Sequence, residues 1–184
     1  MNVYENCPHF IGPRLTLRPV RDSDAQALLA VYSDPQAQPY FNADNCTCDF
    51  RYTTLEQMQD CIAMWRWSYA QGHFVRWTIC SEKLPIGTVE LFRRTSEQDI
   101  YDNCALLRID LRSIFEMEEI VFELLELLVP RAMELFGCTC MATKVPPFAA
   151  ERMLALARKG FVPSDAPLIG HGGSFYGDYW LLRA

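Results

Sequence analysis

Cys104-Ala105-Leu106-Leu107-Arg108-Ile109-Asp110-Leu111 is an almost continuous apolar run, which predicts a deeply buried strand. A helical pattern follows over about residues 116–136, and Gly137 ends it at a position that tolerates a left-handed backbone. We expect Pro130 to kink or divide this helix, because proline removes one hydrogen bond and clashes with the preceding turn. Residues 138–144 predict the next strand, so the middle of the chain is expected to form a strand, a long helix and a strand.

The segment upstream of this unit predicts a strand followed by a helix. Residues 14–19, Arg-Leu-Thr-Leu-Arg-Pro, alternate polar and apolar side chains, as a half-buried strand does. Asp22 and Ser23 offer side-chain oxygens to the first amides of a helix, and the dipeptide Asp34-Pro35 ends it.

A second helix and a hairpin are expected before the central unit. Thr54 and Gln57 have the spacing of a capping box for a helix that runs to about residue 71. The hydrophobic period then changes to two in residues 73–80 and 86–92, which predicts two strands joined by the polar turn 81–85. The expected buried face of the second helix consists of Met58, Ile62, Trp65 and Tyr69.

The segment downstream of the central unit predicts a short helix and a last strand. The helix is expected over residues 149–159 and ends at Gly160, and the strand is expected over 175–182. The whole order predicts one α/β layered domain over residues 1–184, with a mixed sheet and no linker or internal repeat.

The composition favours a folded, cytoplasmic domain. Of the 184 residues, 50% are hydrophobic and 22% are charged, which excludes an intrinsically disordered chain. No stretch approaches the roughly 20 uncharged apolar residues of a membrane-spanning helix, and residues 1–10 lack the pattern of a secretory signal. The formal net charge of −6 argues against a nucleic-acid surface, which would concentrate Lys and Arg. We therefore expect neither a membrane nor a nucleic-acid partner.

The eight cysteines are expected to be free thiols, because they are spread through a domain that we place in a reducing compartment. Cys46 with Cys48, and Cys138 with Cys140, form two CxC pairs that could in principle surround a zinc ion. The second pair falls in a predicted buried strand, where small apolar thiols suit a core. Since the three histidines also share no metal-ligand spacing, no metal is predicted.

Short motifs at the joints of this order carry a resemblance to a known family. They are Arg14-Leu15-Thr16-Leu17-Arg18-Pro19, Asp24-Ala25, Ser33-Asp34-Pro35, Trp77-Thr78-Ile79, Ile86-Gly87-Thr88-Val89 and Lys159-Gly160-Phe161. With these motifs the chain resembles the GNAT superfamily of N-acetyltransferases, in the branch that includes the ribosomal-protein-alanine acetyltransferases. The resemblance implies an α+β layered fold, with a mixed, mostly antiparallel central sheet and helices on both faces. It also implies acetyl-CoA as the cosubstrate.

The resemblance further implies a place for the coenzyme. In the family, the pantetheine arm pairs with the backbone of the strand that corresponds to residues 107–111, where two strands splay apart. The pyrophosphate sits on the start of the next helix, where free amides and the helix dipole attract an anion. The coenzyme-binding positions implied in this chain are Ile109, Leu111, Arg112, Met117, Glu118, Glu119 and Ile120.

The chain departs from the family pattern in two places. Residues 112–119 read Arg-Ser-Ile-Phe-Glu-Met-Glu-Glu, and the family's closely spaced glycines would fall on Met117 and Glu119. The three glutamates of this segment can each stabilise the helix dipole by about 0.3 to 1 kcal/mol, and thereby take the role of the coenzyme anion. In the last helix, Ala149 and Leu156 stand where the family usually has an asparagine and a tyrosine that protonates the leaving thiolate.

Two carboxylates are candidates for the base that amine acetylation requires. Glu90 lies on the second hairpin strand and could face the cleft, and Asp110 interrupts the apolar run of the buried strand. The alternative for Glu90 is an exposed strand carboxylate, and the alternative for Asp110 is an ion pair with Arg108 or Arg112.

Two functions stay open at this point. The first is an N-acetyltransferase that moves an acetyl group from acetyl-CoA to a primary amine of a small molecule, or of a peptide or protein N-terminus. Its acceptor side would be built from residues 36–53. The second is a GNAT-fold protein that has lost catalysis and serves as a binding or dimerisation module, in which case a homodimer is expected.

Overall fold

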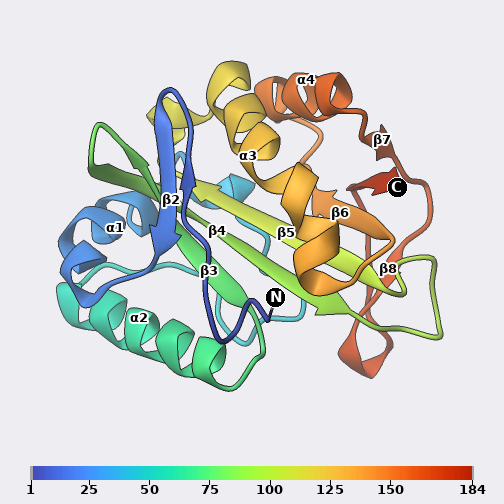
Figure 1. The fold of residues 1–184 in the computed structure, drawn as a ribbon, viewed down its shortest axis with the longest axis horizontal. Helices are drawn as coiled ribbons and strands as arrows, with labels where there is room; N and C mark the ends of the chain where they lie inside the picture. The colour runs from blue at the N-terminus through green and yellow to red at the C-terminus, as the bar shows by residue number, and fades with distance from the viewer. Residues whose placement is uncertain (1, 184) are drawn as a thin grey trace.

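The computed structural model describes residues 2–183, and its centre is one eight-stranded sheet of order β1-β2-β3-β4-β5-β6-β10-β7 (Figure 1). Its strands are β1 (Phe10–Ile11), β2 (Leu15–Pro19), β3 (Val75–Ser81), β4 (Leu84–Arg94), β5 (Cys104–Leu111), β6 (Cys140–Lys144), β7 (Val162–Pro163) and β10 (Tyr179–Arg183). Neighbouring strands pair antiparallel, except that β5 and β6 are parallel. The prediction of a mixed, mostly antiparallel sheet is therefore confirmed.

Helices cover both faces of this sheet, as predicted. They are α1 (Ala25–Tyr32), α2 (Leu55–Ala70), α3 (Glu118–Phe136) and α4 (Ala150–Lys159). One hydrophobic core lies between the sheet and α3 with α4, and a second lies beneath α1 and α2. Figure 1 shows α3 and α4 next to each other and α1 near α2. No helix within residues 2–183 has the length and apolar character needed to cross a membrane.

Successive side chains of β4 and β5 point alternately to the two faces of the sheet. Val89 and Leu91 on β4, like Leu107 on β5, belong to the core beneath α3. The residues between them, Glu90 and Arg108, point to the opposite face, because successive side chains of a strand alternate. Glu90 and Arg108 therefore lie on the same face of the sheet, which α1 and α2 partly cover.

The hairpin turn is shorter than the predicted segment 81–85. Strand β4 begins at Leu84, so the turn consists of Glu82 and Lys83, whose φ angles are 49° and 72°. Two central residues with positive φ give a turn whose twist matches that of the paired strands. The pairing of Ser81 with Leu84 closes this turn, and polar composition alone does not reveal so tight a connection.

The last predicted strand, 175–182, is in fact two strands. Residues Phe175–Tyr176 form β9, which pairs with β8 (Leu168–Ile169) in a separate two-stranded sheet. Asp178 then takes a φ of 64°, which turns the chain before β10 joins the main sheet beside β6. Gly177 and Asp178 interrupt the apolar residues at this turn, so the sequence carried a turn signal that the prediction of one continuous strand did not use.

The long helix α3 runs through Pro130 undivided, so of the kink or division predicted there, the division does not occur. It begins at Glu118 rather than at 116, after a 3-10 turn over Ser113–Phe115, and Gly137 ends it in the left-handed conformation as predicted. The apolar side chains before and after Pro130 are buried against the sheet. Tertiary packing of this face therefore outweighs the single hydrogen bond that proline removes.

The predicted N-terminal cap is confirmed at the second helix, α2, and is wrong at the first, α1. Thr54 and Gln57 form the predicted capping box at the start of α2. At α1, by contrast, the predicted side-chain cap is absent, because the N-cap residue Asp24 makes no cap hydrogen bond to the first amides of the helix. Its carboxylate instead accepts the backbone N–H of Arg21 at 3.0 Å, before the 3-10 turn Asp22–Asp24, and binds the side chain of Arg18.

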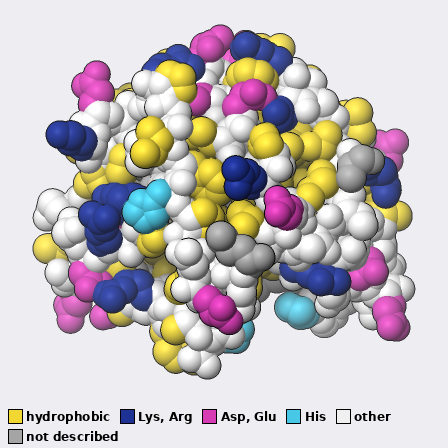
Figure 2. Space-filling model, viewed as in Figure 1, with side chains coloured by type: hydrophobic (Ala, Val, Ile, Leu, Met, Phe, Trp, Pro, Cys, Tyr) yellow, Lys and Arg dark blue, Asp and Glu magenta, His cyan; other side chains and the backbone are white. Residues whose placement is uncertain are grey.

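Charged side chains of both signs are interspersed with hydrophobic ones on the face of the molecule drawn in Figure 2.

Candidate active site

The parallel strands β5 and β6 separate at one end. Their pairing stops where Leu107 lies opposite Thr143, whereas β5 continues beside β4 as far as Leu111. Beyond Leu107 the edge of β5 that faces β6 therefore has no strand partner among residues 2–183. This is the splayed arrangement that the family resemblance implied at residues 107–111.

The backbone of Ile109 and Leu111 faces this open edge. Arg112 donates its N–H to the carbonyl of Ile86, at the start of β4, at 3.0 Å. Because successive residues of a strand direct their N–H and C=O groups to opposite sides, those of Ile109 and Leu111 point away from β4. Their side chains are buried in the core beneath α3, so only their backbone groups are available to a ligand.

The segment after β5 binds carboxylates from elsewhere in the chain. Asp34 Oδ2 accepts the backbone N–H of Ser113 at 3.0 Å and its hydroxyl at 2.6 Å. Glu151 on α4 accepts the backbone N–H of Glu118, the first residue of α3, at 2.9 Å. These amides open the 3-10 turn and the helix, where orphan N–H groups attract anions.

The side chains of this segment have different surroundings. Arg112 and Glu119 are exposed, as is Met117, with 45% of its surface accessible, whereas Ile120 is buried in the core. Glu118 is half-buried and lies 3.4 Å from Arg158 of α4. The five predicted coenzyme positions from 112 to 120 are therefore adjacent, but only part of their surface is open.

Glu116 is not part of the helix and instead forms a buried ion pair with Arg152 of α4. The guanidinium also donates through Nη1 to the carbonyl of Tyr40 at 3.2 Å. Burial raises the pKa of the Glu116 carboxyl, and the charge of Arg152 offsets part of this rise. Of the three glutamates expected to act on the helix dipole, only Glu118 and Glu119 lie in the first turn.

The two halves of this region differ in how they suit an acyl-coenzyme A. The open edge at Ile109 and Leu111 offers extended backbone groups to a pantetheine arm. The helix start already holds the carboxylate of Glu151, and Glu118 and Glu119 add negative charge beside it. In this conformation the helix start does not fit a diphosphate, because like charges repel and its first amide is engaged.

The two predicted catalytic carboxylates lie in one buried cluster. Glu90 accepts from Arg76 through Oε2 at 2.5 Å and from Arg108 through Oε1 at 2.9 Å. Asp110 accepts from Arg76 at 2.9 Å and from the hydroxyl of Tyr32 at 2.7 Å. The expected pairing of Asp110 with Arg108 or Arg112 is therefore wrong, because its partner Arg76 lies on β3, two strands away from β5 in the sheet.

Burial and charge compensation keep this cluster together. Glu90 and Asp110 are each 2% exposed, and the guanidinium of Arg76 lies 4.2 Å from the ring centre of Trp65. Two arginines and two carboxylates make the cluster formally neutral, which is the condition under which charges are tolerated in a core. Burial and the charge of Asp110 raise the pKa of Tyr32 well above its ordinary value.

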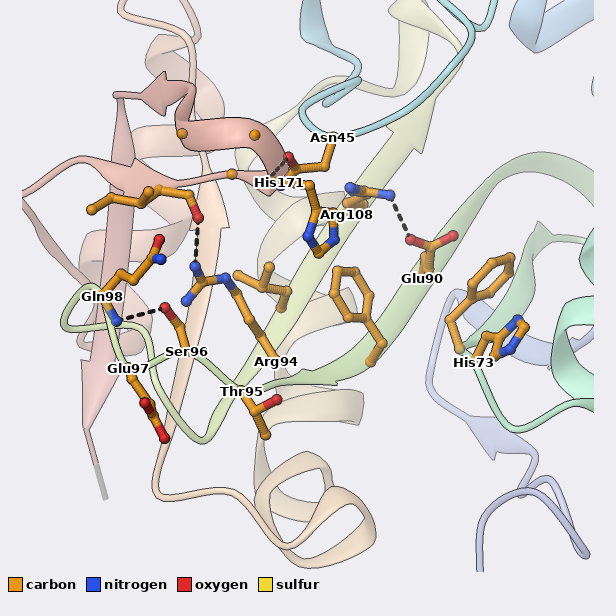
Figure 3. Close-up of a pocket in the computed structure, with 17 residues that line it drawn as sticks. Asn45, His73, Glu90, Arg94, Thr95, Ser96, Glu97, Gln98, Arg108 and His171 are labelled. Atoms are coloured by element: carbon orange, nitrogen blue, oxygen red, sulfur yellow. Dashed lines mark hydrogen bonds and ion pairs between the residues drawn. The ribbon is translucent and has the colours of Figure 1, made fainter.

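A cavity of about 840 Å³ opens on this face of the sheet (Figure 3). Glu90 and Arg108 contribute to its lining, together with Phe92 and Leu106 of the same two strands. In Figure 3, His73 lies at one end and Gln98 near the opposite end, with Asn45 and His171 beside Arg108. Of the two predicted catalytic residues, Glu90 alone lines this cavity.

A second polar group continues from Arg108 toward β6. Arg108 Nη2 donates to the carbonyl of Asp44 at 2.7 Å, and the carboxylate of Asp44 accepts from Lys144 at 2.8 and 2.9 Å. The hydroxyl of Tyr179 on β10 also donates to Asp44, at 3.0 Å. Asp44 belongs to the segment 36–53 that the sequence assigned to the acceptor side.

Sequence reasoning missed Arg76, Asp44 and Lys144 as members of these groups. Arg76 carried a usable signal, because a charged residue inside an otherwise apolar strand must find a buried partner. The other two come from segments far apart in the chain, so no local pattern connects them.

The positions aligned with the family's asparagine and tyrosine serve packing here. Ala149 and Leu156 are both buried in the core beneath α3 and α4.

The second cysteine pair, Cys138 and Cys140, lies where the chain enters β6. Burial raises the pKa of the Cys138 thiol to about 11, and the strand predicted from 138 begins at Cys140. No group of three or more His, Cys, Asp or Glu side chains within residues 2–183 is placed to hold a metal ion.

Comparison with known families and folds gives a consistent result. A sequence model described as acetyltransferase (GNAT) domain matches residues 14–147 of the chain. A search of curated protein sequences gives no significant match.

Several solved structures share the fold. A protein from Vibrio cholerae described as a ribosomal-protein-serine acetyltransferase has a TM-score of 0.73 and 15% identity, with 100% of both chains covered. RimL, a ribosomal alpha-N-protein acetyltransferase in complex with coenzyme A, has a TM-score of 0.70 and 13% identity, over 96% of this chain and 98% of that one. RimJ from Mycobacterium smegmatis, in complex with coenzyme A disulfide, has a TM-score of 0.69 and 15% identity, over 92% of this chain and 82% of that one.

Proposed function

Because the chain belongs to the acetyltransferase (GNAT) domain family, we propose that it is an N-acetyltransferase that uses acetyl-CoA. The acceptor is a primary amine of a peptide or protein N-terminus, or of a small molecule. The observation that carries this proposal is the open edge of β5 at Ile109 and Leu111. The same strand forms the floor of the cavity together with β4. Acetyl-CoA would supply the activated acyl group, and this chain's residues would hold both reactants.

Each end of the donor has proposed partners in the chain. The backbone of Ile109 and Leu111 would hold the pantetheine arm, which needs only N–H and C=O groups in an extended row. The phosphate end would lie near Arg112 and the start of α3, over Met117 to Ile120, after the carboxylate there has moved.

Glu90 is the better of the two candidate bases. It lines the cavity, whereas Asp110 lies deeper and binds Tyr32 and Arg76. The attacking amine must lose one proton, and the Glu90 carboxylate would accept it directly or through a water molecule. Arg108 would act as a positioning residue, because it holds Glu90 and the carbonyl of Asp44 at once.

The volume of the cavity, about 840 Å³, gives room for the first residues of a peptide acceptor. Its walls come from the loop after β4, the segment 169–173 and Asn45. The names of RimL and of the Vibrio cholerae protein refer to ribosomal-protein acceptors of those proteins, which supports testing protein N-termini first.

A second candidate function is a module without catalysis. One specific observation favours it: the Glu151 carboxylate accepts a hydrogen bond from the first backbone N–H of α3, where the coenzyme phosphates would lie. The buried Ala149 and Leu156 add to this, because neither can donate a proton to a leaving thiolate.

The test is acetyl transfer to a library of peptides that differ at the first residue, with acetyl-CoA as donor. Release of free coenzyme A and the acetylated peptide masses are measured together. We expect acetylation of the α-amine of a subset of the peptides. Coenzyme binding without transfer to any peptide or small amine would favour the non-catalytic module, and lack of coenzyme binding would reject the donor assignment.

A further inference from the structure

Three contacts tie α4 to the segment that follows β5. Glu151 accepts the first backbone N–H of α3, from Glu118, at 2.9 Å. The next residue, Arg152, forms the buried ion pair with Glu116. Arg158, two turns further on, lies 3.4 Å from Glu118. The contacts at Glu151 and Arg152 come from the first turn of α4, so this turn covers the start of α3.

The ion pair spans the opening between the two separated strands. Glu116 follows β5 and Arg152 follows β6, so the pair joins the segments that leave the two strands where they part. Arg152 is further held by the carbonyl of Tyr40, and the ring of Phe148 packs edge-on against the Tyr40 ring at 5.1 Å. The chain's own side chains therefore bridge this opening where the two segments leave the strands.

The charges on the two sides of this contact differ. Residues 112–119 hold one arginine and three glutamates, whereas the facing side of α4 offers two arginines, Arg152 and Arg158, and one carboxylate, Glu151. An arginine keeps its charge under all ordinary conditions and binds phosphate oxygens with its planar donors. Arg152 would therefore be able to bind a phosphate, but its donors face Glu116 and the Tyr40 carbonyl.

We propose that the first turn of α4 is a latch over the donor site, that the Glu116–Arg152 pair holds it closed, and that parting this pair admits the coenzyme and gives Arg152 to its phosphates. This inference rests on the proposed function, since it concerns the donor of that reaction. It adds a closed state and a phosphate-binding residue that neither the fold nor the family match assigns.

The rest of α4 is anchored independently of the latch. Ala155 and Leu156 are buried in the main core, and Lys159 pairs with Glu126 of α3 at the far end of the helix. The first turn can therefore move while the helix stays in place. The Glu126–Lys159 pair also offers a matched control, because it joins the same two helices through the same charge types away from the site.

The test is calorimetric titration of the full chain with coenzyme A at low ionic strength. Glu116→Gln and Glu151→Gln should each tighten the dissociation constant at least tenfold relative to the unchanged chain, and Glu126→Gln should leave it unchanged. Adding Arg152→Met to Glu116→Gln should remove the gain. Since Glu116 is buried, the exposed Glu151 provides the variant that tests the latch even where Glu116→Gln does not fold.

Hydrogen exchange gives a second readout that needs no ligand. In Glu151→Gln the amide of Glu118 should exchange at least tenfold faster than in the unchanged chain, with the amides of β5 unaffected. Coenzyme binding of equal strength in all variants, with no change in exchange, overturns the latch and leaves the proposed function standing. No coenzyme binding by any variant, with faster exchange in Glu151→Gln, overturns the proposed function and with it the role of the latch.

Discussion

Arg76 Nη2 lies 2.5 Å from Oε2 of Glu90, and both side chains are buried at the centre of the sheet. The same guanidinium reaches Asp110, so Arg76 is the shared partner of the two carboxylates that the sequence offers as bases. Removing one member of a buried ion pair typically costs about 3 to 5 kcal/mol, because the remaining charge stays uncompensated. Experiments on this cluster must therefore measure folding and activity together.

Where acetyl transfer is detected, Glu90→Gln should lower kcat/KM by about 10² to 10⁴, the range for losing a positioned proton acceptor. Arg76 binds Oε2 of Glu90 and Arg108 binds Oε1, and glutamine keeps the shape of the side chain and one of these two oxygens, so part of the packing survives. Steady-state kinetics, with a thermal melt of each protein, provides the measurement. Full activity in a folded Glu90→Gln protein would move the base to Asp110 or to bulk water.

The double substitution Met117→Gly with Glu119→Gly should tighten coenzyme A binding at least tenfold. Two unit charges about 6 Å apart at an effective dielectric of about 20 repel by roughly 2 to 3 kcal/mol. Because Glu119 is exposed to solvent, the actual repulsion is smaller than this. A tenfold change in affinity requires only about 1.4 kcal/mol. Met117 precedes the helix, so only the glycine at 119 should cost stability, about 1 kcal/mol.

This effect should be largest at low salt, where charge repulsion is least screened. Titration calorimetry of both proteins, with denaturation curves beside it, checks that affinity and stability move in opposite directions. Equal affinities would mean that the coenzyme does not use this helix start.

Gly87→Ala should destabilise the fold by about 1 to 3 kcal/mol or more, the cost of overpacking. A Cβ at Gly87 would lie 2.2 Å from the backbone oxygen of Asp110 and 3.0 Å from Cα of Leu111. The clash would push β4 away from the stretch of β5 that carries the open edge, so coenzyme binding should weaken as well.

Gly177→Ala is the matched control for this substitution, because a Cβ there meets no atom within 4 Å. Its unfolding free energy should stay within about 0.5 kcal/mol of the unchanged chain. Urea denaturation of both variants makes the comparison, and equal stabilities would show that β4 and β5 tolerate a wider spacing at Gly87.

The stability of the fold should fall in acid partly through Glu123. Burial alone would raise the pKa of this carboxyl, but hydrogen bonds from the Arg14 side chain and from the amides of Arg14 and Leu15 outweigh burial and lower it. A carboxyl with a lowered folded pKa stabilises the fold above its unfolded pKa, near 4.5, and loses this contribution as pH falls through the folded pKa.

Urea denaturation from pH 7 to pH 3 measures this dependence. The unfolding free energy of the unchanged chain should fall more steeply below about pH 4.5 than that of Glu123→Gln. Parallel curves for the two proteins would contradict a role for this carboxylate in acid unfolding.

Local patterns predicted most elements of the fold, because burial of one face leaves a period in the sequence. The capping box of Thr54 and Gln57 and the helix end at Gly137 are also set by neighbouring residues, so they too were predictable. The turn between β3 and β4 was predicted too long, because its two residues with left-handed backbone, Glu82 and Lys83, are not glycine. The break at Asp178 was missed.

The sequence by itself determined the layered fold and most of the order of its elements, whereas the family resemblance pointed to β5 as the strand that carries the open edge at Ile109 and Leu111. Only the tertiary structure decided that Arg76 is the partner of Glu90 and Asp110, and that Glu151 and Arg152 cover the start of α3. Periodicity reports how buried each residue is. A buried charge, in contrast, must pair with an oppositely charged side chain that folding brings close to it. That choice depends on strand order and helix packing, which no local pattern contains.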